Sequence, residues 1–309
     1  MAGTPQQMSG RTWIDLILLA FVWGLSFLAM RLALDEIGPL TVALHRVGWA
    51  ALVLWIVLAL RRLPMPLSPR VWLAFAVMGA LNNVIPFSLI AWGQLTIETG
   101  LASILNASTA LWGVTVAAIL LPEEQLTPRR TVGVILGFAG VLVAIGWQAL
   151  GTFDIRSLSQ LAVLTAGLSY ALAGAWARKR LNHLPPEVSA TGMLTSSTLL
   201  LFPLVWLVEG PPTLDLTLRS WIGIVYVSTM ATAVAYLLYY RLIRAAGSGN
   251  TMLVTLLLIP VGIIAGAVVL NESLGPNAFM GFALIALGLA VLDGRLLGKK
   301  RLAPDRADG

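Results

Sequence analysis

The sequence has no cysteine, two histidines and charged residues at only 11% of its 309 positions. The lack of cysteine excludes disulfides, thiolate nucleophiles and cysteine-ligated metals. The two histidines, His45 and His183, are too few to build a metal centre, and we expect no metal and no other cofactor. Soluble domains carry charges at about 25% of positions, whereas hydrophobic residues make up 58% of this chain. The composition therefore indicates an integral membrane protein.

Ten apolar stretches of about 20 residues, enough to cross about 30 Å of hydrocarbon, follow one another along the chain. They cover residues 13–33, 40–60, 71–93, 100–121, 130–149, 158–177, 188–208, 220–242, 249–270 and 276–297. We therefore expect an all-α integral membrane protein with ten transmembrane helices. The connections between the stretches are too short to form a separate soluble domain.

Carboxylates are scarce inside the predicted helices. Of fourteen acidic residues, only Asp15 and Asp293 fall within the predicted spans, both within about a turn of a helix end. An exporter that couples protons to lipophilic cations ordinarily binds both at a carboxylate in mid-membrane. The scarcity favours a neutral solute over proton-coupled export of drugs or other metabolites, which stays open as the alternative. An intramembrane enzyme is favoured least, because no nucleophile with a base and no metal cluster is evident.

Arginine and lysine, which set the orientation of a membrane protein, divide unevenly between the two sides. With a cytoplasmic N-terminus, sixteen of the twenty basic residues fall on the cytoplasmic side, three on the other side, and Arg46 inside a helix. The three are Arg31, Arg156 and Arg219. We therefore expect both termini in the cytoplasm. Since topology accounts for the positive charge, we expect no nucleic-acid partner.

The two halves of the chain repeat each other at an offset of 148 residues, as in the pairs Glu124/Glu272 and Pro128/Pro276. Five helices per half is an odd number, so the halves must be inverted relative to each other in the membrane. Inverted repeats place a substrate site near their shared axis. We expect repeats at residues 13–149 and 158–297 and cytoplasmic tails at residues 1–12 and 298–309.

Repeated features at the helix ends suggest structural roles. Glu124 and Glu272 each precede a helix, where a carboxylate can accept hydrogen bonds from the free N–H groups of the first turn. We expect both to cap the following helix rather than to act in transport. Each half also has two glycines seven residues apart, which permits close helix packing. These are Gly133 and Gly140 in the first half, and Gly281 and Gly288 in the second.

A family resemblance is carried by the Trp23-Gly24-x-Ser26-Phe27 element of the first helix, the arginine of the second and the paired Glu-x-Leu turns. In these features the chain resembles EamA-type members of the drug/metabolite transporter superfamily, from about residue 13 to residue 297. The resemblance implies that the fifth and tenth helices lie outside, while the other eight surround a central cavity. It also implies export of aromatic and other neutral amino acids.

His45 and Arg46 lie about a third of the way into the second predicted helix. An arginine at this depth costs about 3 kcal/mol or more unless it pairs or faces a cavity. Arg46 either binds backbone carbonyls and holds the two halves together, or attracts a substrate carboxylate. His45 either tunes the site by protonation or fills a packing position. Both are candidate substrate-binding residues.

The third and fourth predicted helices carry polar residues in mid-span. Asn82, Asn83 and Pro86 are expected to break the third helix, with Pro86 as a candidate hinge. A polar stripe at helical spacing follows on the fourth; it consists of Asn106, Ser108, Thr109 and Trp112. Unpartnered amides are costly in hydrocarbon, so these side chains must face protein or water. Bonding between helices and lining of a substrate cavity both meet that requirement, and Asn82, Asn83, Asn106 and Trp112 are candidate substrate contacts.

Aromatic side chains complete the candidate site. Most of the eleven tryptophans are expected near the membrane surface, where indoles favour the head-group layer. The rings assigned to the site are Trp112, Trp176, Tyr236 and Tyr239. A cavity walled by rings and amides suits a zwitterion with an apolar side chain. Pro260 should kink the ninth helix as a second candidate hinge, although a kink that serves packing explains it equally well.

Together these features predict a multi-pass transporter of the bacterial inner membrane that exports small neutral metabolites, chiefly amino acids, by alternating access. We expect its partners to be the lipid bilayer and a small-molecule substrate. We also expect a monomer.

Overall fold

The computed structural model describes residues 9–120, 127–146, 155–239, 241–242, 245 and 254–293. Within these ranges all regular secondary structure is helical, as predicted. Eight helices are long and apolar enough to span a membrane, and two further apolar helices are shorter. The eight are Gly10–Ala33, Pro39–Arg61, Pro69–Gly93, Thr99–Leu120, Pro128–Ile145, Arg156–Arg180, Pro186–Val208 and Leu218–Tyr239; the shorter two are Val254–Leu270 and Pro276–Leu292. Each predicted stretch overlaps one of these helices, while ten full spans stay a prediction.

Helix starts follow local chemistry. The α-helices are α1 (Gly10–Ala33), α2 (Pro39–Arg61), α3 (Pro69–Gly79), α4 (Ile85–Gly93), α5 (Thr99–Asn106), α6 (Ser108–Leu120), α7 (Pro128–Ile145), α9 (Ile155–Arg180), α10 (Pro186–Val208), α11 (Leu218–Val225), α13 (Val254–Leu270) and α14 (Pro276–Asp293). Proline opens α2, α3, α7, α10 and α14, because its fixed φ suits the first helical position, where the missing N–H costs nothing. At the start of α1, the Ser9 hydroxyl accepts a hydrogen bond from the N–H of Thr12.

Two π-helical segments interrupt the α-helices. The segment η1 (Ala80–Val84) joins α3 to α4, and η2 (Tyr226–Val234) follows α11. Asn82 and Asn83 lie in η1, and Pro86 lies in the first turn of α4. The predicted break in the third helix is therefore a π segment, and the chain continues as a helix on both sides. Such segments are rare and are frequent at functional sites.

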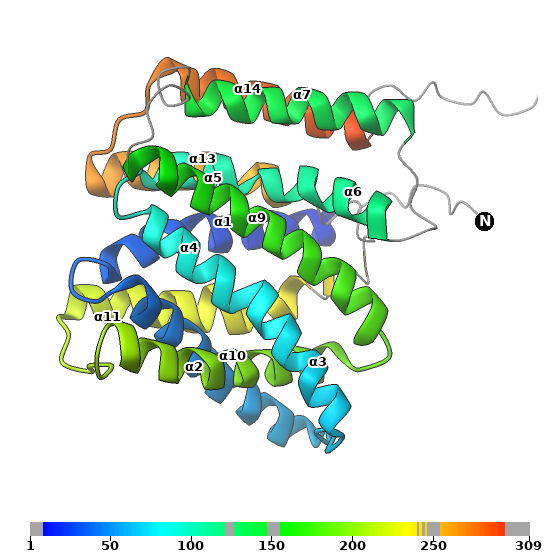
Figure 1. Ribbon diagram of the computed structural model, residues 1–309, viewed down its shortest axis with the longest axis vertical. Helices are drawn as coiled ribbons and strands as arrows, with labels where there is room; N and C mark the ends of the chain where they lie inside the picture. The colour runs from blue at the N-terminus through cyan, green and yellow to red at the C-terminus, as the bar shows by residue number, and fades with distance from the viewer. Residues whose placement is uncertain are drawn as a thin grey trace, which may run out of the picture.

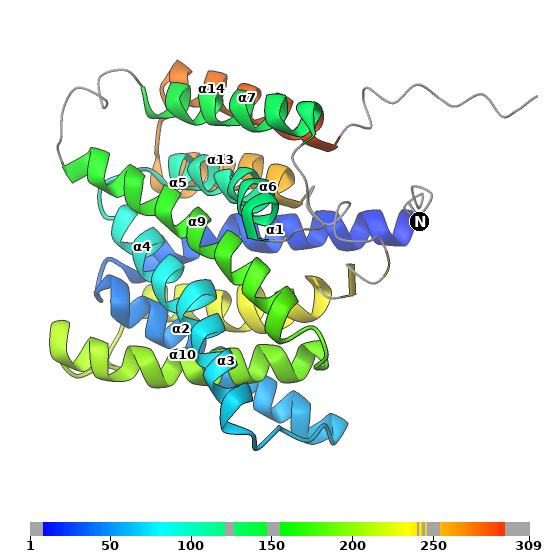
Figure 2. The ribbon, with the colours of Figure 1, turned by 45° about the vertical axis from the view of Figure 1, so that its right-hand side comes forward.

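The helices α7 and α14 form a pair along one side of the molecule (Figures 1 and 2), in agreement with the expected outer position of the fifth and tenth helices. Their glycines permit this close packing. A Cβ on Gly133 would lie 2.8 Å from the carbonyl oxygen of Gly288, and one on Gly140 would lie 2.8 Å from that of Gly281. No side chain fits at such distances, so the predicted role of these glycines in helix packing is confirmed.

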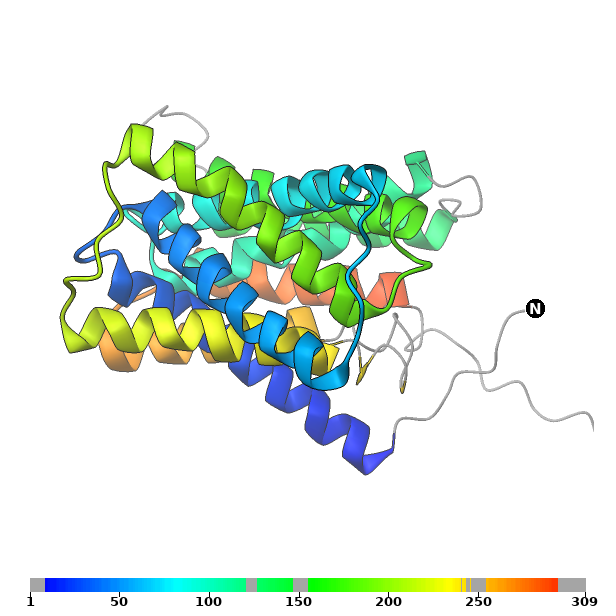
Figure 3. The ribbon, with the colours of Figure 1, turned by 90° about the horizontal axis from the view of Figure 1, so that it is seen from below.

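The helices α2 and α10 form a second pair and run side by side (Figure 3). At one end Arg61 pairs with Glu187 at 2.8 Å. At the other end the Glu209 carboxylate accepts hydrogen bonds from the backbone N–H groups of Leu40 (2.9 Å) and Thr41 (2.8 Å). Glu209 therefore caps the start of α2 from a different helix. α10 begins two residues earlier than predicted, which places Glu187 in its first turn.

The prediction for Glu272 needs correction, and Glu124 lies outside the described residues. One oxygen of the Glu272 carboxylate accepts a hydrogen bond from the Thr99 hydroxyl at 2.9 Å. The other oxygen is buried without a partner among the described residues. Glu272 thus contacts the start of α5 rather than capping α14, because the fold brings α5 against α13 just before the turn.

The apolar core forms two main clusters that locate the centre of the molecule. One cluster includes Leu16 of α1, Ile104 of α5 and Leu258 of α13. The other joins α2, α4, α10 and η2. Tyr170 of α9 packs against both clusters. The region around Tyr170 is therefore the junction of the two.

Candidate functional site

Arg46 of α2 is buried, with 7% of its surface exposed. Its Nε donates to Thr232 Oγ1 of η2 at 3.0 Å, and its Nη1 lies 3.2 Å from Met30 Sδ of α1. The guanidinium carbon lies 3.8 Å from the centre of the Phe87 ring of α4, a cation–π geometry. Within the described part of the chain, none of the ion pairs involves Arg46. Neutral groups therefore hold this charge.

Asn82 and Asn83 take part in a hydrogen-bond network that crosses the molecule. Asn82 Nδ2 donates to the Tyr236 hydroxyl at 3.0 Å, and Asn83 Nδ2 donates to Ser197 Oγ of α10 at 2.9 Å. The Tyr236 hydroxyl donates to Asn83 Oδ1 at 3.3 Å. Asn83 and Ser197 are fully buried. The network joins η1 in the first half to α10 and the end of the eighth predicted helix in the second.

Each π segment is also bonded to another helix through a backbone carbonyl. Trp23 Nε1 of α1 donates to the carbonyl of Ala231 in η2 at 3.1 Å. Ser169 Oγ of α9 donates to the carbonyl of Leu81 in η1 at 2.6 Å. Since unbonded carbonyls are costly in hydrocarbon, these donors stabilise the π segments.

These contacts converge on one group of side chains. The Phe87 and Tyr170 rings meet edge to face with centroids 6.5 Å apart, and Tyr170 and Tyr236 both pack against the apolar cluster that contains Phe87. We define the central cluster as Arg46, Asn82, Asn83, Phe87, Tyr170, Thr232 and Tyr236. Four of these were predicted as site residues. Sequence reasoning did not assign Phe87, Tyr170 or Thr232 to the site. The available signals for Phe87 and Thr232 were the position after Pro86 and the small hydroxyl residues of η2.

His45 lies beside Arg46 in sequence but has different neighbours. Trp49 Nε1 donates to His45 Nδ1 at 3.2 Å, and His45 Nε2 lies 3.2 Å from the carbonyl oxygen of Thr213. This arrangement fits a neutral imidazole that accepts at Nδ1 and donates at Nε2. The ring also faces the edge of Trp221. Of the two explanations left open by the sequence, these contacts favour packing.

Asn106 and Trp112 belong to a separate group of polar atoms at the junction of α5 and α6. Four side-chain atoms here are buried without hydrogen-bond partners among the described residues: Asn106 Oδ1, Ser108 Oγ, Thr109 Oγ1 and Trp112 Nε1. We call them the unpaired polar group. The Trp112 ring packs edge to face against that of Phe138 on α7, with ring centroids 4.7 Å apart. Gly167 of α9 leaves room for the Ser108 side chain, because a Cβ on Gly167 would lie only 3.0 Å from Ser108 Oγ.

The remaining predicted residues are Trp176, Tyr239 and Pro260. Trp176 Nε1 donates to the carbonyl of Ala74 at 3.1 Å, in a small apolar cluster between α3 and α9. The Tyr239 ring lies 5.5 Å from that of Trp23. Pro260 lies inside the continuous helix α13. The structure thus separates Trp176 from the site to which sequence reasoning assigned it.

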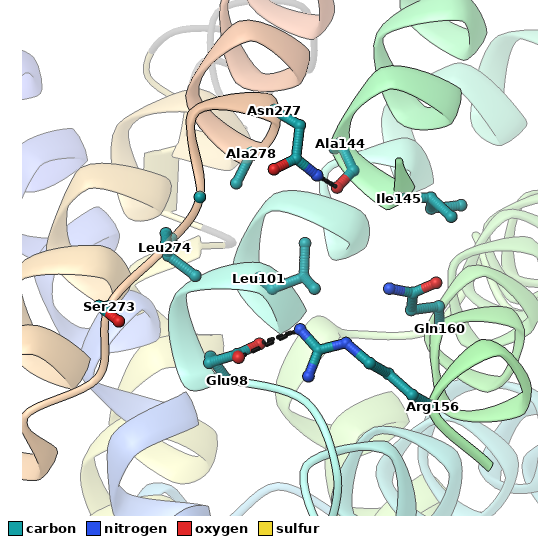
Figure 4. A pocket seen from close by; sticks show the side chains of 11 residues that line it. Glu98, Leu101, Ala144, Ile145, Arg156, Gln160, Ser273, Leu274, Asn277 and Ala278 are labelled. Atoms are coloured by element: carbon teal, nitrogen blue, oxygen red, sulfur yellow. Dashed lines mark hydrogen bonds and ion pairs between the residues drawn. The ribbon is translucent and has the colours of Figure 1, made fainter. Parts of the chain in front are cut away.

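A cavity of about 60 Å³ is found away from the central cluster. It lies where α5, α9 and α14 begin and α7 ends (Figure 4), and its polar lining includes Glu98, Arg156, Gln160 and Asn277. The central cavity expected from the family resemblance therefore stays a prediction. Among the described residues, no group of three or more potential metal ligands is present.

Comparison with known proteins identifies the family. Residues 10–146 and 157–292 match the EamA-like transporter family. The chain is 24% identical over 296 residues to a probable amino-acid metabolite efflux pump of Escherichia coli, covering 92% of this chain and 95% of the relative. It is 27% identical over 304 residues to a probable terminal-alkyne amino-acid exporter of Streptantibioticus cattleyicolor, covering 96% and 98%.

A solved crystal structure superposes with a TM-score of 0.66 and 17% identity, covering 93% of this chain and 98% of the other, which shows a shared fold. The family match covers both halves, and the named relatives are transport proteins. These findings agree with a multi-pass membrane protein that carries solutes and is not an enzyme. The chain therefore belongs to the EamA-like transporter family.

Proposed function

We propose that this transporter exports neutral amino acids, aromatic ones included, and that Arg46 binds the substrate carboxylate in the central cluster. The observation that carries the proposal is a buried guanidinium without a carboxylate partner among the described residues. A buried charge is tolerated when it pairs with an opposite charge, even one that is present only part of the time. A substrate carboxylate supplies that opposite charge.

The groups around Arg46 suit the rest of a zwitterionic amino acid. The rings of Phe87 and Tyr170 offer an apolar surface to its side chain. Asn83 Oδ1 and the Tyr236 hydroxyl offer neutral oxygens to its ammonium group. The names of the relatives, an amino-acid metabolite efflux pump and an amino-acid exporter, support the same substrate class.

Packing between equivalent helices supports an inverted repeat and alternating access. The second helices of the two halves, α2 and α10, pack on each other, and so do the fifth helices, α7 and α14. Each third helix contains a π segment, η1 in one half and η2 in the other. A two-fold axis in the membrane plane would produce these pairings and would pass near the central cluster. Because arginine and lysine divide unevenly between the two sides, we propose that both termini lie in the cytoplasm. We also propose that the protein is a monomer of the bacterial inner membrane.

Proton-coupled export of lipophilic cations is the second candidate. In the described helices, the acidic residues lie near helix ends, as Asp15 does in α1 and Glu187 in α10. Neither is near the central cluster. A cation would also be repelled by Arg46, so the central cluster favours an anionic or zwitterionic solute.

Reconstitution into liposomes tests the proposal. The wild type should transport labelled neutral amino acids such as phenylalanine down their gradient, while Arg46→Gln should reduce the rate at least ten-fold. The variant should stay folded, because removing an unpaired buried charge does not break an ion pair. Arg31→Gln is the matched control, since Arg31 pairs with Asp35 in a partly exposed position. The proposal fails if no amino acid moves, or if Arg46→Gln transports with unchanged rate and half-saturating concentration.

A further inference from the structure

The cavity shown in Figure 4 is lined by one positive and one negative side chain, Arg156 and Glu98, which suits a zwitterion. Arg156 Nη2 donates to both oxygens of Glu98, at 2.7 and 3.1 Å, and Arg156 Nη1 donates to the carbonyl of Thr96 at 3.3 Å. The guanidinium and the carboxylate both line the cavity. The pair is partly exposed, with 45% and 27% of the two side chains accessible. Ion pairs of this exposure hold weakly, so a solute with both charges can insert between them.

Gln160 provides a buried amide at the wall of the same cavity. The residue is 2% exposed, and its Oε1 has no hydrogen-bond partner within the described ranges. Figure 4 shows its amide on the same side of the cavity as Arg156, with the nitrogen toward the cavity, so a half-turn of the amide presents the oxygen to an occupant. A buried amide oxygen without a partner is uncommon and calls for an occupant that donates a hydrogen bond. An ammonium group has three such donors.

The size of the cavity limits the occupant. A volume of about 60 Å³ exceeds the roughly 10–15 Å³ that one water molecule needs. The first turns of α5, α9 and α14 contribute Leu101, Arg156 and Asn277 to the lining. Helix starts favour an anionic group through their free N–H groups. The cavity therefore has room and complementary charge for the α-amino and α-carboxyl groups of one amino acid.

The helix α9 connects this cavity with the interior. Gln160 and Gly167 are seven residues apart and share one face of α9, about 10 Å apart along its axis. Gly167 packs against Ser108 and Thr109 of the unpaired polar group. Tyr170 of the central cluster follows one turn later. One face of α9 thus carries Gln160 at the cavity, Gly167 beside the unpaired polar group and Tyr170 in the central cluster.

From this arrangement we propose that the cavity is a second substrate site, which binds the zwitterionic head group of an amino acid on the release path. The proposal rests on the proposed function. Under the proposed topology, this site opens to the periplasm. Arg156 binds the carboxylate, while Glu98 and Gln160 bind the ammonium group.

Sided transport measurements test the second site. Full-length protein is reconstituted in one orientation, and the half-saturating concentration of labelled phenylalanine is measured separately from each side. The key variant is Gln160→Met, which keeps the side-chain length and the Glu98–Arg156 pair but removes the amide. It should raise the half-saturating concentration about ten-fold from the periplasmic side and leave the cytoplasmic value unchanged.

Two further variants distinguish a loss of substrate binding from a loss of structural stability. Arg156→Gln should have the same one-sided effect, whereas Arg31→Gln, which removes an ion pair outside the cavity, should change neither value. An equal shift from both sides, or no shift in Gln160→Met with unchanged thermal stability, overturns the second site and leaves a cavity that holds only water. In that case wild-type transport and the Arg46→Gln defect would persist, so the proposed function would stand. A wild type that moves no amino acid overturns both proposals.

Discussion

The guanidinium of Arg46 lies over the face of the Phe87 ring, 3.8 Å from its centroid. An aromatic face attracts a cation without neutralising it. A carboxylate at the same place would pair with Arg46 permanently. The ring therefore stabilises the buried charge and leaves it available to an anionic group of a solute.

Replacing the Phe87 ring should destabilise the folded protein. Phe87→Leu removes the cation–π contact and leaves a gap in the core, which together should lower the free energy of unfolding by about 1–3 kcal/mol. Thermal unfolding in detergent measures this change. Phe202→Leu is the control, because Phe202 is 49% exposed on α10. Equal melting temperatures for the two variants would show that the ring does not hold Arg46.

The bond between Trp23 and the Ala231 carbonyl should stabilise η2. Trp23→Phe keeps a ring but removes the Nε1 donor, and an unsatisfied buried carbonyl costs about 1–3 kcal/mol. We expect a lower melting temperature for this variant. Trp206→Phe, at an exposed position, should melt like the wild type. If Trp23→Phe is equally stable, another donor satisfies the carbonyl.

Glu36 should make the connection to α11 sensitive to acid. Its carboxylate accepts bonds from the hydroxyl and N–H of Thr217 and from the Ser220 hydroxyl. These bonds, led by the Thr217 hydroxyl, lower the pKa of Glu36 below its ordinary value of 4.5. A lowered pKa means that the contribution to stability is complete above about pH 4.5 and is lost as the pH falls through the folded-state pKa.

Thermal unfolding of the wild type and Glu36→Gln at several pH values tests this assignment. The stability difference between them should be constant from pH 7.5 to pH 5.5 and should shrink only in more acidic buffer. A difference that disappears already at pH 6 would contradict a lowered pKa.

Topology can be tested by labelling, because the chain has no native cysteine. The arginine distribution predicts that the connection between α10 and α11 faces the periplasm. Asp215→Cys should therefore react with a membrane-impermeant thiol reagent in intact cells. Labelling only after the cells are broken would reverse the orientation.

Transport should not require a proton gradient. The described helices carry acidic residues only near their ends, and both nitrogens of His45 are used in a pattern that fits a neutral ring. We expect His45→Ala to keep transport down a substrate gradient at any fixed pH. Uphill transport that appears only with an imposed pH gradient, and disappears in His45→Ala, would establish coupling through this histidine.

The sequence by itself determined that the chain is helical and where its apolar helices lie. Hydrophobic length and proline at the first helical position act locally, so α2 and α10 begin within two residues of their predicted starts. The glycine pairs also identified a packing surface, because a missing Cβ permits close contact whatever helix lies opposite. Asn82, Asn83 and Pro86 predicted a break in the third helix, and the structure has a π segment there.

Only the tertiary structure decided which side chains meet. Arg46 and Thr232 are 186 residues apart in the chain, and no local pattern relates them. Sequence reasoning assigned Trp176 to the site, but its indole N–H donates to the carbonyl of Ala74. The Glu272 carboxylate accepts a hydrogen bond from the Thr99 hydroxyl instead of capping the next helix. Helical periodicity shows which face of a helix is polar or apolar, whereas the neighbour of that face depends on how the helices of the two halves pack together.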